Sequence, residues 1–278
     1  MTPDRPATSL VHAACTVLGT AAALDKAALA REAARLWHTG TLPLRPATGV
    51  LPVPLKRPAR PDRPELLAPN RMPRRAAHGA RGRFALLHAV AHIELNAIDL
   101  AFDMVARFAG EDVPWDLPRA FFDDWVRVGG EEARHFTLLE ERLGALGGGY
   151  GDLPAHDGLW EAAADTAHDL LARLAVVPMV LEARGLDVTP GMIERLARAG
   201  DTDSAEVLRV IYEEEKDHVA VGARWFHALC AAGGIEPQAR FQALVRRHFR
   251  GRLKPPFNEP ARTAAGLPAA FYDPMSLS

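Results

Sequence analysis

The sequence is poor in cysteine, in aromatic residues and in long apolar runs, and each shortage excludes a class of protein. Its 278 residues include two cysteines, Cys15 and Cys230, too few for a disulfide framework, an iron–sulfur cluster or a zinc ribbon. No run approaches the roughly 18–20 apolar residues of a membrane span. The composition, 48% hydrophobic and 24% charged with a net charge of −2, excludes wholesale disorder. Abundant Ala, Leu and Arg, against 7% aromatics, favour helices.

The N-terminus has an apolar stretch at 9–24 that invites comparison with an export signal. His12 interrupts this stretch and Asp25 follows it, while Asp4 and Arg5 leave the preceding residues without net positive charge. We therefore predict a helix of a cytoplasmic protein, with no membrane association.

Residues 81–233 predict four long amphipathic helices, because their apolar residues recur with helical period. Each has nearly thirty residues, or roughly 40–45 Å at 1.5 Å per residue, which predicts an all-α four-helix bundle. Asp116, Asp157 and a capping box of Asp203 with Glu206 are expected at helix starts. A short extra helix is expected to begin at Pro190. The four long helices are expected at 81–109, 118–146, 158–186 and 204–230.

Two flanking regions are expected to pack against this bundle. Residues 1–80 predict short helices at 8–23 and 25–38, followed by an extended Pro/Arg-rich arm, since its recurring prolines exclude regular helix and central strand. Residues 234–278 predict one more helix, at 238–250, and an irregular tail.

Two of the long helices carry the same short motif, Glu-x-x-His. The pairs are Glu132 with His135 and Glu215 with His218, and residues three apart share one helix face. Each pair follows a helix with one glutamate in an apolar stretch: Glu94 lies 38 residues before Glu132, and Glu182 lies 33 before Glu215. The chain thus contains two halves of the same plan.

Four carboxylates and two imidazoles facing the inside of a bundle would require cations, because buried carboxylates are costly unless compensated. Two divalent ions balance four negative charges, and this ligand set suits iron or manganese. The sequence therefore predicts two metal ions, iron with manganese as the alternative. The predicted ligands are Glu94, Glu132, His135, Glu182, Glu215 and His218.

Other polar residues near these positions are interpreted differently. His88 and His92 lie about 120° and 160° around their helix from Glu94, so we expect hydrogen-bonded packing histidines, or residues that support the metal ligands, rather than ligands themselves. Asp99 and Asp103 share that far face and are expected to pair with arginines of the flanking arms.

Pro178 and Tyr212 leave two interpretations open. Pro178, four residues before Glu182, predicts a kink that either widens the bundle beside the metals or merely accommodates packing. Tyr212 lies one turn from Glu215, where it is either a hydrogen-bond donor or redox group beside the metals or an ordinary buried tyrosine.

The six ligands in this order resemble those of the ferritin-like di-iron superfamily, which includes bacterioferritin, rubrerythrin and oxygen-activating carboxylate enzymes. The motifs HAVAHIELNAIDLAFD, DDWVRVGGEEARHF and YEEEKDHVAVGARWF resemble more narrowly a bacterial ferritin-like family of unknown function, similar to the tRNA hydroxylase that oxidises a prenylated adenosine. The resemblance covers about residues 50–262 and implies a ferritin-like bundle with the same six metal ligands. The rubredoxin module of rubrerythrin is absent, since there is no Cys-x-x-Cys pair.

We expect a di-iron oxidoreductase that activates O2 to oxidise or hydroxylate an organic substrate, with electrons from a partner reductase, because no flavin or nucleotide motif is visible. One alternative is a tRNA-modifying hydroxylase, favoured by nine Lys/Arg against two acids between Lys56 and Arg83 and by a basic segment at Arg246–Lys254. Packing of these arms on the acidic bundle is the competing interpretation. A second alternative is a ferroxidase, iron-handling or peroxide-scavenging protein. The sequence carries no signal for the oligomeric state.

Overall fold

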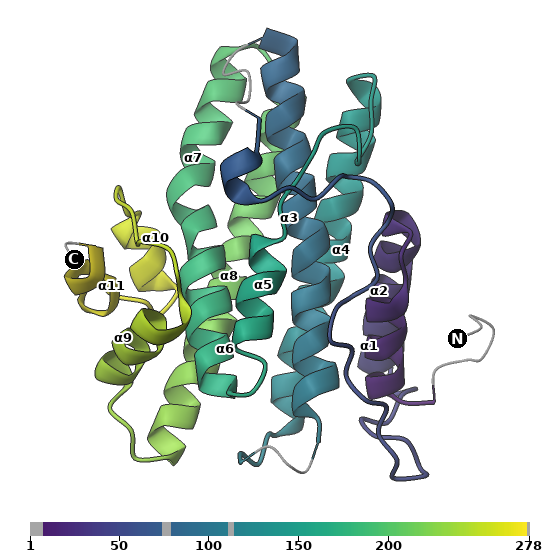
Figure 1. Ribbon diagram of the computed structural model, residues 1–278, viewed down its shortest axis with the longest axis vertical. Helices are drawn as coiled ribbons and strands as arrows, with labels where there is room; N and C mark the ends of the chain where they lie inside the picture. Colours follow the sequence, from purple (N-terminus) through teal and green to yellow (C-terminus); the bar gives the residue numbers. More distant parts are fainter. Residues whose placement is uncertain (1–7, 74–78, 111–113, 277–278) are drawn as a thin grey trace. The chain divides into compact units, whose positions relative to one another are not determined.

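The computed structural model describes residues 8–73, 79–110 and 114–276, and within these ranges its regular secondary structure is helical (Figure 1). The described residues form no β-strand; one isolated bridge joins Leu66 to Ala155. The all-α prediction is confirmed. The contacts divide the chain into two compact units, Met1–Trp160 and Glu161–Ser278. The division into 1–80, 81–233 and 234–278 stays a prediction.

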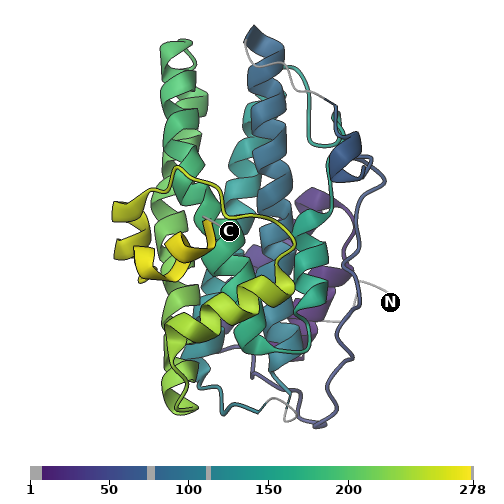
Figure 2. The same cartoon turned by 60° about the vertical axis from the view of Figure 1, so that its left-hand side comes forward.

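The first unit contains α1, α2, α3 and α4, with a single turn of 3₁₀-helix, η1, on the connecting arm. Its two long helices, α3 and α4, run side by side in Figures 1 and 2, and α2 packs on α4. The helix at 81–109 corresponds to α3 and that at 118–146 to α4, each within two residues. The bounds are α1 Leu10–Gly19, α2 Ala23–His38, η1 Pro69–Arg71, α3 Gly79–Phe108 and α4 Arg119–Ala145.

The proline-rich arm lies along the helices of the first unit. The backbone N–H of Ala59 donates to the carbonyl of Leu18 at 2.8 Å, and Arg107 of α3 donates to the carbonyl of Leu55 at 3.2 Å. These contacts satisfy backbone groups that the prolines keep out of helix or sheet. Two residues of the predicted basic stretch, Arg74 and Arg75, lie outside the described residues.

The second unit contains the remaining helices. The antiparallel pair α7 and α8 carries the shorter α9, α10 and α11 against it, as Figure 2 shows. The helix α5 straddles the boundary between the units. The bounds are α5 Gly158–Asp165, α6 Leu170–Val176, η2 Val177–Glu182, α7 Ala183–Arg198, α8 Thr202–Ala232, α9 Pro237–His248, α10 Glu259–Ala264 and α11 Ala269–Ser276.

The single helix expected at 158–186 is wrong in detail. The chain leaves the helix at 166–169, and Asp169 caps a new helix by accepting from the N–H of Ala172 at 3.1 Å. After α6 the helix widens into a π-helix, η2, before α7 resumes the normal pitch.

The separate helix expected at Pro190 is also wrong, because Pro190 lies inside α7. A proline cannot donate to the carbonyl four residues earlier, here that of Leu186. The side-chain amide of Asn258 donates to this carbonyl at 3.0 Å, so the vacancy left by the proline is filled. The same arrangement recurs in α11, where Gln242 donates to the carbonyl of Ala270, four residues before Pro274.

The predicted caps were displaced by two residues in two cases. Asp201, not Asp203, caps α8 by accepting from the N–H of Ser204, and Pro118, not Asp116, occupies the cap position of α4. Asp157 precedes α5 as expected and forms an ion pair with Arg57 of the arm.

The helix α3 is long and apolar enough to cross a membrane by length and composition alone. Its most apolar window is 78% buried within the structure, which is typical of a core helix. The structure therefore indicates no membrane span among the described residues, and the cytoplasmic location stays a prediction.

Candidate metal centre

The first half of the predicted site lies between α3 and α4. The close approach of these helices depends on Gly129, one turn before Glu132, because a Cβ there would lie 2.7 Å from the ring of Phe102 on α3. This contact brings the faces that carry Glu94 and Glu132 together. Buried apolar residues flank the two acids on these faces, Ala91 and Ile98 beside Glu94 and Trp125 and Val128 beside Glu132, as the helical period predicts.

Glu94, Glu132 and His135 form a compact cluster. His135 Nδ1 lies 3.0 Å from Glu94 Oε2 and 3.4 Å from Glu132 Oε2. One ligand atom of each residue lies within 4.8 Å of the others, so the cluster could hold a metal ion. All three side chains are at most 3% exposed. Buried acids and an imidazole at this spacing have the donor types that iron and manganese bind.

The charge of this cluster is unbalanced in the protein alone. Burial raises the pKa of Glu94 well above its usual value, the nearby Glu132 carboxylate raises it further, and His135 opposes the shift. The carboxyl group of Glu94 therefore resists ionisation without a cation beside it. A bound divalent ion would compensate the negative charge and so remove the free-energy cost of ionising Glu94. The donor set therefore fits a divalent metal ion electrostatically.

The second half lies in the second unit. Glu182 is the last residue of η2, and η2 packs on α8, which carries Glu215 and His218. His218 is fully buried, and its Nδ1 lies 3.7 Å from Glu215 Oε1. Glu215 is 12% exposed. The second unit thus supplies the same donor types as the first. In both units a helix with a single Glu packs on a helix with Glu-x-x-His.

The proline of η2 makes the tightest contact of this half. A Cβ at Gly222, one turn after His218, would lie 2.4 Å from Cβ and Cγ of Pro178, one turn before Glu182. The segment in which Pro178 predicts a kink is thus a π-helix in close contact with α8. Short π-helical turns occur frequently at functional sites.

Comparison with known proteins shows the family to which this chain belongs. The model of a family described as a protein of unknown function (DUF455) matches residues 19–273. The chain belongs to this family. A curated relative from Haemophilus influenzae, described as an uncharacterized protein, is 43% identical over 209 residues, covering 74% of this chain and 72% of the relative. No solved structure matches.

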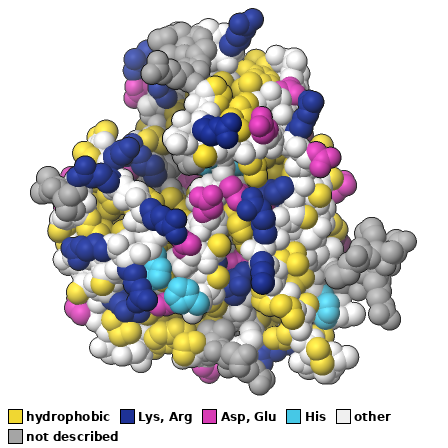
Figure 3. All heavy atoms as spheres, viewed as in Figure 1, with side chains coloured by type: hydrophobic (Ala, Val, Ile, Leu, Met, Phe, Trp, Pro, Cys, Tyr) yellow, Lys and Arg dark blue, Asp and Glu magenta, His cyan; other side chains and the backbone are white. Residues whose placement is uncertain are grey.

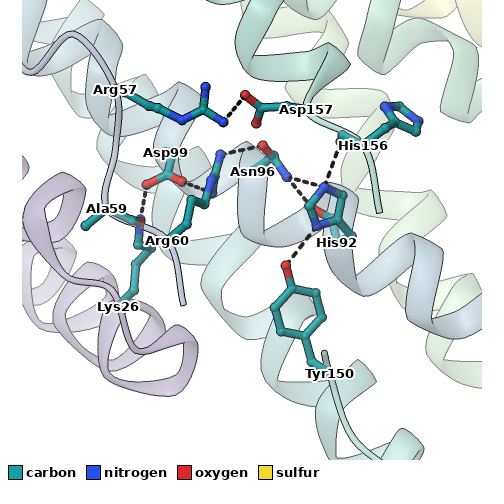
Figure 4. Close-up of polar contacts among 10 residues, drawn as sticks. All are labelled: Lys26, Arg57, Ala59, Arg60, His92, Asn96, Asp99, Tyr150, His156 and Asp157. Atoms are coloured by element: carbon teal, nitrogen blue, oxygen red, sulfur yellow. Dashed lines mark hydrogen bonds and ion pairs between the residues drawn. The ribbon is translucent and has the colours of Figure 1, made fainter. Parts of the chain in front are cut away.

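Two further histidines of α3 in this DUF455 member have packing roles, as predicted. His92 lies between Tyr150, whose hydroxyl is 2.8 Å from Nδ1, and the carbonyl of His156, 2.9 Å from Nε2 (Figure 4). Burial lowers the pKa of His92 to about 4, so the ring is neutral. His88 Nε2 accepts from the N–H of Gly151 at 2.9 Å.

Asp99 pairs with the arm, as expected, and with a partner that the sequence did not suggest. Arg60 of the arm and the fully buried Lys26 of α2 both contact its carboxylate, and Arg60 also donates to Asn96 at 2.5 Å (Figure 4). Lys26 lies 73 residues from Asp99, and no local pattern signals such a pair. Asp103 pairs at 2.7 Å with Arg107 of its own helix.

Tyr212 has a contact that the sequence did not predict. Its hydroxyl accepts from the side-chain amide of Asn258 at 2.9 Å, and Lys216 lies 4.5 Å from its ring centroid. A role for Tyr212 beside the metals stays a prediction. The neighbouring Glu131 and Glu213 are salt-bridged along their own helices, to Arg127 and Lys216 respectively.

Proposed function

We propose that the chain holds two metal ions, preferably iron, with the ligands of its two Glu and Glu-x-x-His halves. The observation that carries the proposal is the buried cluster of Glu94, Glu132 and His135, in which His135 lies within 3.4 Å of both acids. The second unit repeats this donor pattern, and the two patterns together supply six ligands for two ions. The second-half ligands are Glu182, Glu215 and His218.

Charge supports two divalent ions rather than one. Four carboxylates carry four negative charges when ionised, and two divalent cations neutralise them. A single ion would leave two negative charges in a site where burial already raises the pKa of Glu94.

We further propose that the protein is an oxidoreductase acting on an organic substrate with O2. When bound, two irons would supply the oxygen activation and the electron transfer that no side chain provides. Glu94 and Glu132 would bind and neutralise the ions, and a bound cation would favour the ionised form of Glu94, whose pKa is raised by burial. The electrons would come from a partner reductase.

The surrounding side chains would protect the reaction from water. Trp125, Val128 and Phe136 of α4 are at most 2% exposed, and they follow the helical face that carries Glu132. Such a dry apolar lining strengthens electrostatic interactions inside a site and limits side reactions.

The proposal is tested by metal analysis of the full chain after anaerobic loading with Fe(II) and removal of excess ion. We expect about two irons per chain in the wild type, from the two-ion ligand set. Glu132→Gln should lose metal because it removes a buried carboxylate ligand. The matched control is Glu131→Gln, which alters the adjacent half-buried acid paired with Arg127 and should bind as the wild type.

A wild type that binds no iron, or a Glu131→Gln variant that loses as much as Glu132→Gln, would contradict the metal site. Oxygen consumption by the loaded protein, with a chemical reductant, then tests the activity. Rapid Fe(II) oxidation without reductant-dependent turnover would favour the ferroxidase alternative.

A further inference from the structure

The end of α9 and the segment after it form the most basic stretch of the second unit. Residues 237–258 contain six Lys or Arg and no Asp or Glu. We call the part from Arg246 to Lys254 the basic segment. Its cations are the exposed side chains of Arg246, Arg247, Arg250, Arg252 and Lys254.

The basic segment differs from the other basic region of the sequence, the proline-rich arm, in how its cations are paired. In the arm of the first unit, Arg57 and Arg60 are committed to Asp157 and Asp99. These two cations therefore form ion pairs within the first unit, as expected if a basic arm packs on the protein.

Most of the cations of the basic segment are exposed to solvent. Arg250 pairs with Asp165 at 2.9 Å but remains 88% exposed. Arg246, Arg247 and Lys254 have no carboxylate within ion-pairing distance among the described residues. Figure 3 shows Lys and Arg side chains gathered over α9 and the chain that follows it.

The basic segment begins at the end of α9, and the apolar face of α9 is packed inside the protein. Phe241, Leu244 and Val245 of α9 are buried, so the basic face is the one that remains exposed. The large hydrophobic side chains that the described structure exposes all lie in the first unit, so the second unit, which carries the basic segment, exposes none among its described residues. A membrane-binding helix would need exposed apolar residues to insert beside its cations.

We propose that the basic segment binds the phosphate backbone of a nucleic acid. Guanidinium groups bind phosphate oxygens in bidentate fashion, and four of the five cations are arginines. The chain as a whole has a net charge of −2, so attraction of a polyanion depends on this local concentration of positive charge. Contacts to phosphates alone give little sequence preference.

The test is binding of a fluorescent 20-nucleotide single-stranded RNA, and of DNA of the same sequence, to the metal-free full chain by anisotropy. We expect binding at 50 mM salt that weakens by about tenfold or more at 200 mM. The triple variant Arg246→Gln/Arg247→Gln/Lys254→Gln should bind at least about tenfold more weakly, because it removes three phosphate contacts. Circular dichroism melting confirms that the variant is folded.

The matched control removes the same charge elsewhere: Arg31→Gln/Arg195→Gln/Arg209→Gln, all exposed. It should bind within about twofold of the wild type if the effect is local, since net charge is then equal. No wild-type binding at 50 mM salt, or equal losses in both triple variants, overturns the proposal. Equally tight binding of vesicles with 30% anionic lipid would overturn the choice of nucleic acid. Because the assay needs no metal, its outcome is independent of the metal-loading experiment.

Discussion

The contact between Gly222 and Pro178 gives a prediction whose size can be worked out from the structure. In Gly222→Ala the new Cβ would lie 2.4 Å from two atoms of the proline ring, whereas ordinary contact begins at 3.4 Å. The ring cannot rotate away, so η2 and α8 must separate by about 1 Å to restore ordinary contact. Overpacking of this kind costs about 1–3 kcal/mol, against a gain of about 1 kcal/mol in helix propensity.

We therefore expect Gly222→Ala to lower the free energy of unfolding by about 1 kcal/mol. The control is Gly191→Ala in α7, where a Cβ would meet nothing within 4 Å and where alanine should stabilise by about 1 kcal/mol. Urea unfolding followed by circular dichroism measures both. Separation of η2 from α8 should also displace Glu182 relative to His218, so Gly222→Ala should bind less iron than Gly191→Ala. Equal stabilisation by the two substitutions would refute the reasoning.

Two other predictions concern buried ionisable groups of the first unit. Asp99→Asn should lower stability by about 3–5 kcal/mol in thermal unfolding, because it leaves Lys26 and Arg60 without their carboxylate. Glu194→Gln, in an exposed pair, should cost less than about 1 kcal/mol, and equal effects would contradict the buried assignment. The pKa of His92 is lowered from 6.5 to about 4, so the unfolded chain takes up a proton first as pH falls. Stability should therefore be full above pH 6.5 and fall by about 3 kcal/mol towards pH 4. In chelator-treated protein, His92→Gln should flatten this slope, and an unchanged slope would show that other groups cause it.

The long helices were predictable because their signal is repeated many times. The helices α3 and α4 contain about eight and about seven turns, so an error at one position does not change the predicted helix. The register of Glu94 follows from the same period, and the structure places it beside Glu132 and His135 as a consequence.

The wrong predictions of a helix cap and of a helix start each depended on single side chains. Asp201 directly precedes α8 and Asp203 is its second residue, and either residue type could serve as a cap, so local sequence does not separate them. Pro190 was predicted to start a helix because a proline inside a helix leaves a carbonyl without its backbone donor. The donor that replaces it, Asn258, lies 68 residues later, where the local sequence does not reveal it. The ion pair of Lys26 with Asp99 likewise joins residues that only tertiary packing brings together.

Pro190 of α7 and Pro274 of α11 each free a backbone carbonyl for a contact with another segment of the chain. At Leu186 and Ala270 the carbonyl freed by the ring becomes a receptor for one amide side chain from another segment. Replacing Pro190 by an ordinary residue would restore an N–H that competes with Asn258 for the same oxygen. The gap in the helix is thus an attachment point for the C-terminal segment, and the energetic effects of changing its two members are coupled rather than additive.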